Sequence, residues 1–251
     1  ASVANFTGSV AALNVQSNTT LTSTASVEDS AVAAVVGITG AKPTGTVTLS
    51  NNTLAATAEG NLGVTTVALK AANLNVTGAL GTEVTQGVVR DPTTGTASAG
   101  LGVVALSVQS NEGGMLTANN EGTAVALDFN DQGTGPVAVA IDGITATLAD
   151  NQLNSAATAN SASTSATLEG TNGTGLSAAV GNSQRNLDMT VSANAGTISP
   201  LAVSLTSGAV TGSTLTLTGN DLNAAATGNS AANRLNVSLE TASGSALLTA
   251  A

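Results

Sequence analysis

Two copies of one twelve-residue sequence decide the fold: Asn151-Gln-Leu-Asn-Ser-Ala-Ala-Thr-Ala-Asn-Ser-Ala162 and Asn220-Asp-Leu-Asn-Ala-Ala-Ala-Thr-Gly-Asn-Ser-Ala231. They align without gaps and are identical at nine of the twelve positions, and a looser copy runs from Asn52 to Asn61. We expect the shared asparagines and leucines to be structural repeat positions, with the asparagines stacked as ladders between copies. These positions are Asn52, Leu54, Asn61, Asn151, Leu153, Asn160, Asn220, Leu222 and Asn229.

The leucine of this motif serves as a phase marker for the whole chain. It falls at Leu21, Leu54, Leu116, Leu153, Leu187 and Leu222, with gaps of 33, 62, 37, 34 and 35 residues. The long gap is close to two units, so one copy near Val84–Val88 is too eroded to see. The spacing predicts a single repetitive domain over residues 1–251, with about seven quasi-repeats of roughly 34 residues. A Gly- and Thr-rich stretch at 91–100 is a possible soft boundary.

Period-two alternation of apolar and polar residues recurs along the chain, as in Thr46–Leu49, Ala124–Phe129 and Ile144–Leu148. Most such runs have about four to six residues, are rich in Val and Thr, and end at Gly, Asn or Asp, which is typical of strands. No sustained helical stripe occurs. The chain is therefore predicted to be all-β, and Gly170–Gly175 is expected to be a loop.

The composition favours a thin core. The 251 residues include two Phe, no Trp and no Tyr, although hydrophobic residues make up 42%. In a β-solenoid, stacked strands about 4.8 Å apart enclose a narrow interior that small side chains fill. The alternative is one or two pilin-like or immunoglobulin-like β-sandwich domains, which often rely on a buried Trp or Tyr. The lack of large aromatics favours the solenoid.

Several functional classes conflict with the composition. Without Cys or His the chain can form no disulfide, conventional zinc site or cysteine hydrolase. Five basic against 15 acidic residues give a net charge of −10, which disfavours nucleic-acid binding. The chain has no apolar run of about 18 residues, so no membrane-spanning helix is predicted. The Ala1-Ser-Val-Ala start and the low Lys content lead us to expect an exported protein, extracellular or on the cell surface.

Oxygen ligands cluster at Asp128, Asn130 and Asp131, just before Gly133. Such a cluster suits a calcium loop, but the last ligand position of an EF-hand would fall on Val139, which cannot bind a cation. A plain turn between strands is the competing interpretation, so calcium is a weak expectation and no other cofactor is expected. Carboxylate pairs also serve glycosidases, but the chain lacks the aromatic platforms that sugar clefts use. We expect no enzyme activity.

Two C-terminal segments carry a family resemblance. The run Thr227-Gly-Asn-Ser-Ala-Ala-Asn-Arg-Leu-Asn-Val237 resembles the Gly-Asn-x-Ala-x-Asn repeats of secreted bacterial filament proteins, and Gly175–Asn186 is similar to repeats of curli- and Fap-type functional amyloids. The resemblance covers about the last 100 residues. It implies export, polymerisation into extracellular fibres, and a biofilm or sheath role.

These observations lead us to expect a non-enzymatic structural protein whose partners are copies of itself in a filament, sheath or surface layer. Residues 1–10 carry no charged side chain and residues 239–251 carry only Glu240, so strand edges near both ends are expected to lack charged caps. The alternative is an adhesin stalk or binding module, with a ligand site in the acidic window 110–135.

Overall fold

A computed structural model of the chain describes residues 3–28, 31–38, 44–76, 102–121, 124–131, 141–196, 201–206, 210–244 and 247–250. The prediction of an all-β protein is confirmed: these residues are almost entirely strand, and none of them is helical. The possible boundary at 91–100 and the eroded copy near 84–88 lie outside the described residues.

The strands are of two kinds, long ones of 18 to 23 residues and short ones of two to eight. In chain order they are β1 (Val3–Thr7), β2 (Val10–Glu28), β3 (Ala31–Ile38), β4 (Gly45–Ser50), β5 (Thr53–Asn75), β6 (Val103–Glu121), β7 (Ala124–Asp131), β8 (Ile141–Asp142), β9 (Ile144–Ala149), β10 (Gln152–Thr174), β11 (Ser177–Asn194), β12 (Leu201–Thr206), β13 (Val210–Thr211), β14 (Thr214–Thr218), β15 (Asp221–Ser243) and β16 (Leu247–Ala250).

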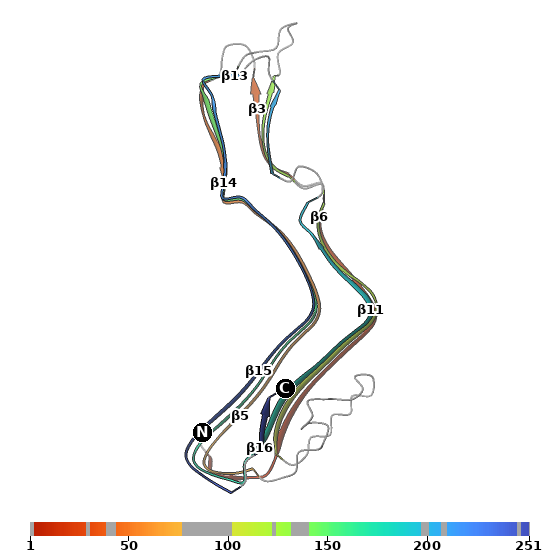
Figure 1. Ribbon diagram of the computed structural model, residues 1–251, viewed down its shortest axis with the longest axis vertical. Helices are drawn as coiled ribbons and strands as arrows, with labels where there is room; N and C mark the ends of the chain where they lie inside the picture. The colour runs from red at the N-terminus through yellow and green to blue at the C-terminus, as the bar shows by residue number, and fades with distance from the viewer. Residues whose placement is uncertain are drawn as a thin grey trace.

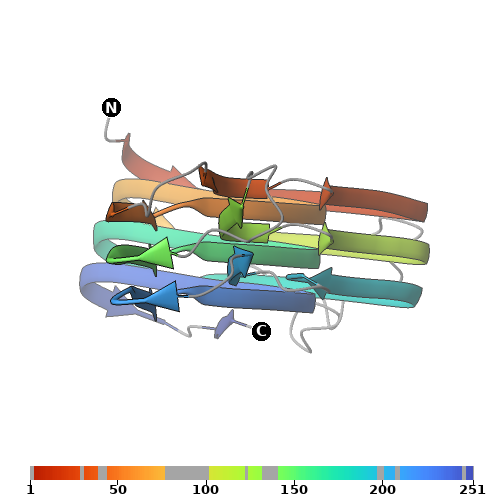
Figure 2. The same cartoon turned by 90° about the horizontal axis from the view of Figure 1, so that it is seen from above.

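The chain follows the same path three times, and each pass lies beside the one before it. The first pass comprises β2 to β5, the second β6 to β10 and the third β11 to β15. Every strand pairing is parallel. Figure 1 looks along the stacking direction and shows two walls, and Figure 2 shows the three tiers from the side. We call the stack β1-β5-β10-β15 the β10 wall, and the stack β2-β6-β11-β16 the β6 wall.

Successive passes are in register over long distances, but with different offsets. Stacked residues are 99 and then 69 positions apart on the β10 wall, and 93 and then 75 apart on the β6 wall. The shortest offset is about twice the 34-residue spacing of the leucines. Leu54, Leu153 and Leu222 pair directly. On the β6 wall, by contrast, Leu21 pairs with Gly114, so the other phase leucines do not share one register.

The interior between the walls is one layer of mostly small side chains, in three apolar clusters. The first lies where the walls meet near Gly175 and includes Leu74, Leu168 and Val180. The second lies toward the far end of the cross-section and includes Leu127 and Leu148. The third, between them, consists mainly of alanines packed on Leu116. Each pass thus buries a thin strip of apolar surface that continues into the next pass.

The walls turn at positions where left-handed backbone is stacked from pass to pass. Between β4 and β5, and at the equivalent places in later passes, stand Asn51 (φ 58°), Asp150 (φ 55°) and Gly219 (φ 62°). Asn, Asp and Gly are the residues that adopt this conformation most readily. The corner is therefore encoded separately in each pass.

The β6 wall bends at a similar stack without ending its strands. Thr20 (φ 57°), Gly113 (φ 64°) and Asp188 (φ 50°) lie at one level, between register pairs on either side. A β-branched residue is strained in this conformation, so Thr20 is the least suited of the three. Thr20 donates its hydroxyl hydrogen to the carbonyl oxygen of Thr19 (2.6 Å).

Candidate functional site: amide ladders between the walls

Six asparagine side chains form a continuous file between the two walls, which we call the double asparagine ladder. Its members alternate between the walls, because each strand of one wall sits at a height between two strands of the other. In stacking order they are Asn18, Asn61, Asn111, Asn160, Asn186 and Asn229. Three of them, Asn61, Asn160 and Asn229, belong to the repeat positions that the sequence singled out.

Hydrogen bonding along the double asparagine ladder has one direction. Each side-chain Nδ2 donates to the Oδ1 atoms of the members that follow it, with N···O distances of 2.7 to 3.0 Å. Asn111, for example, donates to Asn160 (2.8 Å) and Asn186 (2.9 Å) and accepts from Asn18 and Asn61. Every amide hydrogen of a central member is therefore used within the stack.

The orientation of these amides follows from the backbone around them. Asn111 Nδ2 also reaches the carbonyl oxygen of Ala159 (3.1 Å), and Asn186 Nδ2 reaches that of Gly228 (2.9 Å). A carbonyl oxygen can only accept, so the nitrogen must face it. Asn111 and Asn160 are fully buried. A buried amide that loses its partners costs about 1–3 kcal/mol, so the double asparagine ladder is a demanding register constraint.

A second ladder and a leucine stack occupy the corner of the β10 wall. Asn52 Nδ2 donates to Asn151 Oδ1 (2.9 Å), and Asn151 Nδ2 donates to Asn220 Oδ1 (2.8 Å). Asn151 Nδ2 also donates to the backbone carbonyl of Leu49 on β4, and Asn220 Nδ2 donates to that of Leu148 on β9. Two residues further on, the leucine stack described above passes through the interior. All nine repeat positions thus lie on this wall, in three register lines.

The β6 wall holds functional residues that the sequence analysis missed. Gln184 Nε2 donates to Gln109 Oε1, and Gln109 Nε2 donates to Gln16 Oε1, both at 2.8 Å. Each glutamine also donates to a backbone carbonyl of the β10 wall. The signal was present in the sequence: Leu13–Asn18 and Leu106–Asn111 differ at one position, and both end in Gln-Ser-Asn. The phase leucines of this wall fall on different register lines, so their spacing does not reveal this motif.

The weak calcium candidates lie on one strand. Asp128, Asn130 and Asp131 belong to β7, whose backbone pairs with β3 and β12. Their backbone is therefore strand rather than the turn considered from the sequence, while Gly133 lies outside the described residues. Among the residues that the structure describes, no group of three or more acidic side chains gathers in a way that could hold a metal ion.

The acidic window 110–135 is divided between two strands. Residues 110–121 belong to β6 and 124–131 to β7, and the remainder is outside the described ranges. Glu112 is exposed at the bend of β6, and Glu121 is exposed at its end, where it accepts a hydrogen bond from Asn119 (2.8 Å). In the described part, these two carboxylates stand at different places along the wall.

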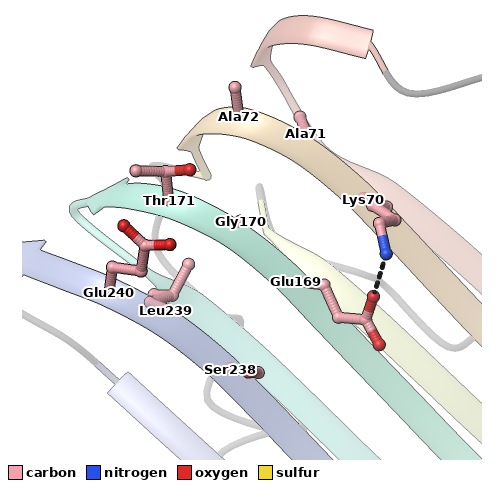
Figure 3. Close-up of a pocket in the computed structure, with 9 residues that line it drawn as sticks. All are labelled: Lys70, Ala71, Ala72, Glu169, Gly170, Thr171, Ser238, Leu239 and Glu240. Carbon is pink, nitrogen blue, oxygen red and sulfur yellow. Dashed lines mark hydrogen bonds and ion pairs between the residues drawn. The ribbon is translucent and has the colours of Figure 1, made fainter.

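A shallow hollow of about 430 Å³ lies on the outer surface of the β10 wall. Figure 3 shows the ion pair at its rim, in which Lys70 Nζ lies 2.8 Å from Glu169 Oε2. The hydrogen bond that Lys70 donates to Glu169, followed by the charge of that carboxylate, raises the pKa of Lys70 above its usual 10.5. The lining residues are Lys70, Ala71, Ala72, Glu169, Gly170, Thr171, Ser238, Leu239 and Glu240. Exposed ion pairs of this kind contribute little, and the hollow has no buried polar group facing it.

No family model, curated protein or solved structure matches the chain. Within the described residues, no helix has the length and apolar character needed to cross a membrane. The site must therefore be interpreted from its own geometry.

Proposed function

We propose that the chain is a β-solenoid and that it serves as a non-enzymatic, extracellular structural protein. Copies of the chain assemble into a filament, sheath or surface layer. The parallel, in-register passes and the narrow interior support a solenoid over a sandwich. The resemblance to secreted filament repeats supports export.

One observation carries the proposal: the inward leucine stack of the β10 wall is open on one side. Leu54 is 8% exposed and Leu153 is 0% exposed, but Leu222 on β15 is 46% exposed. Strand β15 is the last strand of its sheet among the described residues. Its backbone edge and its core-facing side chains are therefore available together.

Such an edge favours pairing with another strand. Unpaired N–H and C=O groups provide a template for strand addition, and a matching core strip adds apolar burial. Contact between unlike faces of two copies produces an open filament when the rotation from one copy to the next does not close into a ring. The function proposed is therefore mechanical, with continuity supplied by backbone pairing.

The test is electron microscopy and fibre diffraction of the full chain at neutral pH. We expect filaments with a meridional spacing of about 4.8 Å from stacked strands. Leu222→Lys places a charge on the open core strip and is expected to abolish assembly. Asn223→Lys is the matched control, because this residue follows Leu222 and faces outward, and it is expected to assemble normally.

Circular dichroism of each variant checks that the β-structure is retained. Wild-type chains that stay as dispersed monomers at high concentration would contradict the proposal. That result would favour the stalk or binding module, and residues 110–135 would then be searched for a ligand. Equal assembly of both variants would show that β15 is not the contact.

A further inference from the structure

The sheet β4-β9-β14 carries two unbroken lines of threonine on its outer face. Thr46, Thr145 and Thr214 pair in one line, and Thr48, Thr147 and Thr216 pair in the other. No other register line across three passes in the described sheets is threonine throughout. The sheet's inward residues, among them Val47, Ala146 and Leu148, pack in the second apolar cluster, which holds the face in place.

The six threonine side chains form a regular two-dimensional array. Figure 1 shows the three strands nearly superimposed near the β14 label, so the sheet has little twist. The lines of equivalent threonines therefore repeat at about 4.8 Å across strands and about 6.7 Å along each strand. Flat stacks are unusual in β-proteins and require ladders such as the ones described above.

Hydrogen-bonded water in ice has a closely related lattice. An O···O distance of about 2.75 Å with tetrahedral angles gives second-neighbour spacings of about 4.5 Å and a layer repeat of about 7.3 Å. The difference between the spacing across strands (about 4.8 Å) and that in ice (about 4.5 Å) accumulates to about 0.6 Å over three strands. The difference between the spacing along a strand (about 6.7 Å) and the ice layer repeat (about 7.3 Å) occurs once and is also about 0.6 Å. Hydrogen bonds between the face and ordered water can absorb either difference in spacing by bending.

The chemistry of the face also suits ice. Four of the six threonines are exposed and two are half-buried, and none bonds through its side chain to another described residue. Although the chain has a net charge of −10, strands β4, β9 and β14 contain no charged residue. Ice is uncharged, so a neutral face that alternates methyl and hydroxyl groups avoids the desolvation cost of a charged one.

We propose that this threonine face binds the surface of ice, through ordered water held by its hydroxyls and methyls. The inference is independent of filament formation, because it uses the outer face of β4, β9 and β14 and not the edge of β15. Its occupant is crystalline water and not a protein.

The experiment freezes a solution of the full chain slowly from a seed and measures the ratio of protein in ice to protein in liquid. We expect wild type to enter the ice and facet its crystals. Thr147→Lys, at the centre of the array, should lower the ratio about tenfold, as a central contact does when it is disrupted. Thr167→Lys is the matched control, an outward threonine on the middle strand of the β10 wall.

Exclusion of the wild type from ice, as for an ordinary solute, would overturn the proposal, and so would equal uptake of both variants. Sedimentation is measured alongside: if Thr147→Lys changes only self-association, the face is a contact between copies, and the proposal fails. If Thr147→Lys lowers the melting temperature, the more exposed Thr145→Lys replaces it.

Discussion

Two neighbouring regions of the interior hold the walls together by different means. Along β10, Ala157 and Ala159 belong to an apolar cluster, the next residue is Asn160 of the double asparagine ladder, and Ala166 begins another apolar cluster. The apolar regions gain stability from burial, which is non-directional. The double asparagine ladder gains it from directed bonds that only one alignment satisfies.

The difference concerns specificity rather than strength. Alanine-rich strips look alike after a shift of two residues, so burial alone specifies the alignment of passes weakly. An asparagine that slips out of the double asparagine ladder leaves buried donors and acceptors unpaired. We infer that the amides set the register while the apolar clusters supply most of the free energy.

The largest loss of stability is expected when a central amide of the double asparagine ladder is removed. Asn111→Leu keeps the volume but leaves the partners on both walls unpaired, and we expect a loss of about 4 kcal/mol in the free energy of unfolding. Urea denaturation measures it. Asn172→Ala, which removes an exposed amide that donates to Asn73 and accepts from Thr241, should cost less than about 1 kcal/mol. Equal losses would refute the special role of the buried file.

The apolar side of the comparison is tested at the leucine stack. Leu153→Ala removes a fully buried side chain and should cost about 3 kcal/mol through lost transfer energy and a cavity. Leu222→Ala makes the same change at the 46% exposed position of the same stack, and in the unassembled chain it should cost less than about 1 kcal/mol. A similar cost at both sites would mean that the edge is covered in solution.

Two glycines at one level of the β10 wall, next to the double asparagine ladder, sharpen the comparison. A methyl group at Gly60 would overlap the backbone carbonyl of Ala159, whereas at Gly228 its nearest neighbour is Asn186 Nδ2, 3.6 Å away. We expect Gly60→Ala to lower stability by about 2 kcal/mol through overpacking beside the double asparagine ladder. Gly228→Ala should be nearly neutral. Thermal unfolding of the pair checks this difference.

Relief of the backbone strain at Thr20 should raise the stability of the chain, whereas the preceding substitutions lower it. Thr20 adopts a left-handed conformation where the equivalent positions hold Gly113 and Asp188. Thr20→Asn is expected to stabilise the chain by about 1 kcal/mol, because Asn tolerates this conformation better. An increase in the urea midpoint is the readout. A decrease would show that the Thr20 hydroxyl bond outweighs the strain.

The smallest effect is expected at the surface ion pair. The pKa of Lys70 is raised, so its contribution is present below pH 10.5 and is lost as the pH rises through the raised value. Because the pair is exposed, Lys70→Met should leave the melting temperature unchanged at neutral pH, with or without salt. A clear loss of stability would place electrostatics beside burial and amides as a third stabilising force.

Much of the β10 wall was predictable from the sequence, because its second and third passes carry nearly the same twelve residues at paired positions and the first pass shares their leucine and asparagines. Identity between 151–162 and 220–231 translates directly into paired strands. The β6 wall was harder to predict, since its three passes share one residue type only at the positions of Gln16, Asn18 and Ala25, while the leucines shift.

Strand length was also beyond the sequence rules. Glycine and polar clusters predicted short strands, and Gly170–Gly175 was expected to be a loop, but residues 170–174 complete strand β10. In a stack of parallel passes, bends such as that at Gly113 are absorbed within a strand, because the neighbouring passes bend with it. The local signals for turns and bends are the same, and tertiary pairing decides between them.

The direction of the amides has an electrostatic consequence. In the double asparagine ladder nitrogen points toward later passes, whereas in the adjacent ladder of Gln16, Gln109 and Gln184 it points toward earlier ones. Aligned amide dipoles add along a stack, as in a helix, and the potential at its ends grows. The three glutamine amides oppose the six asparagine amides and cancel part of their field, so the molecule combines long hydrogen-bonded columns with a reduced potential at their ends.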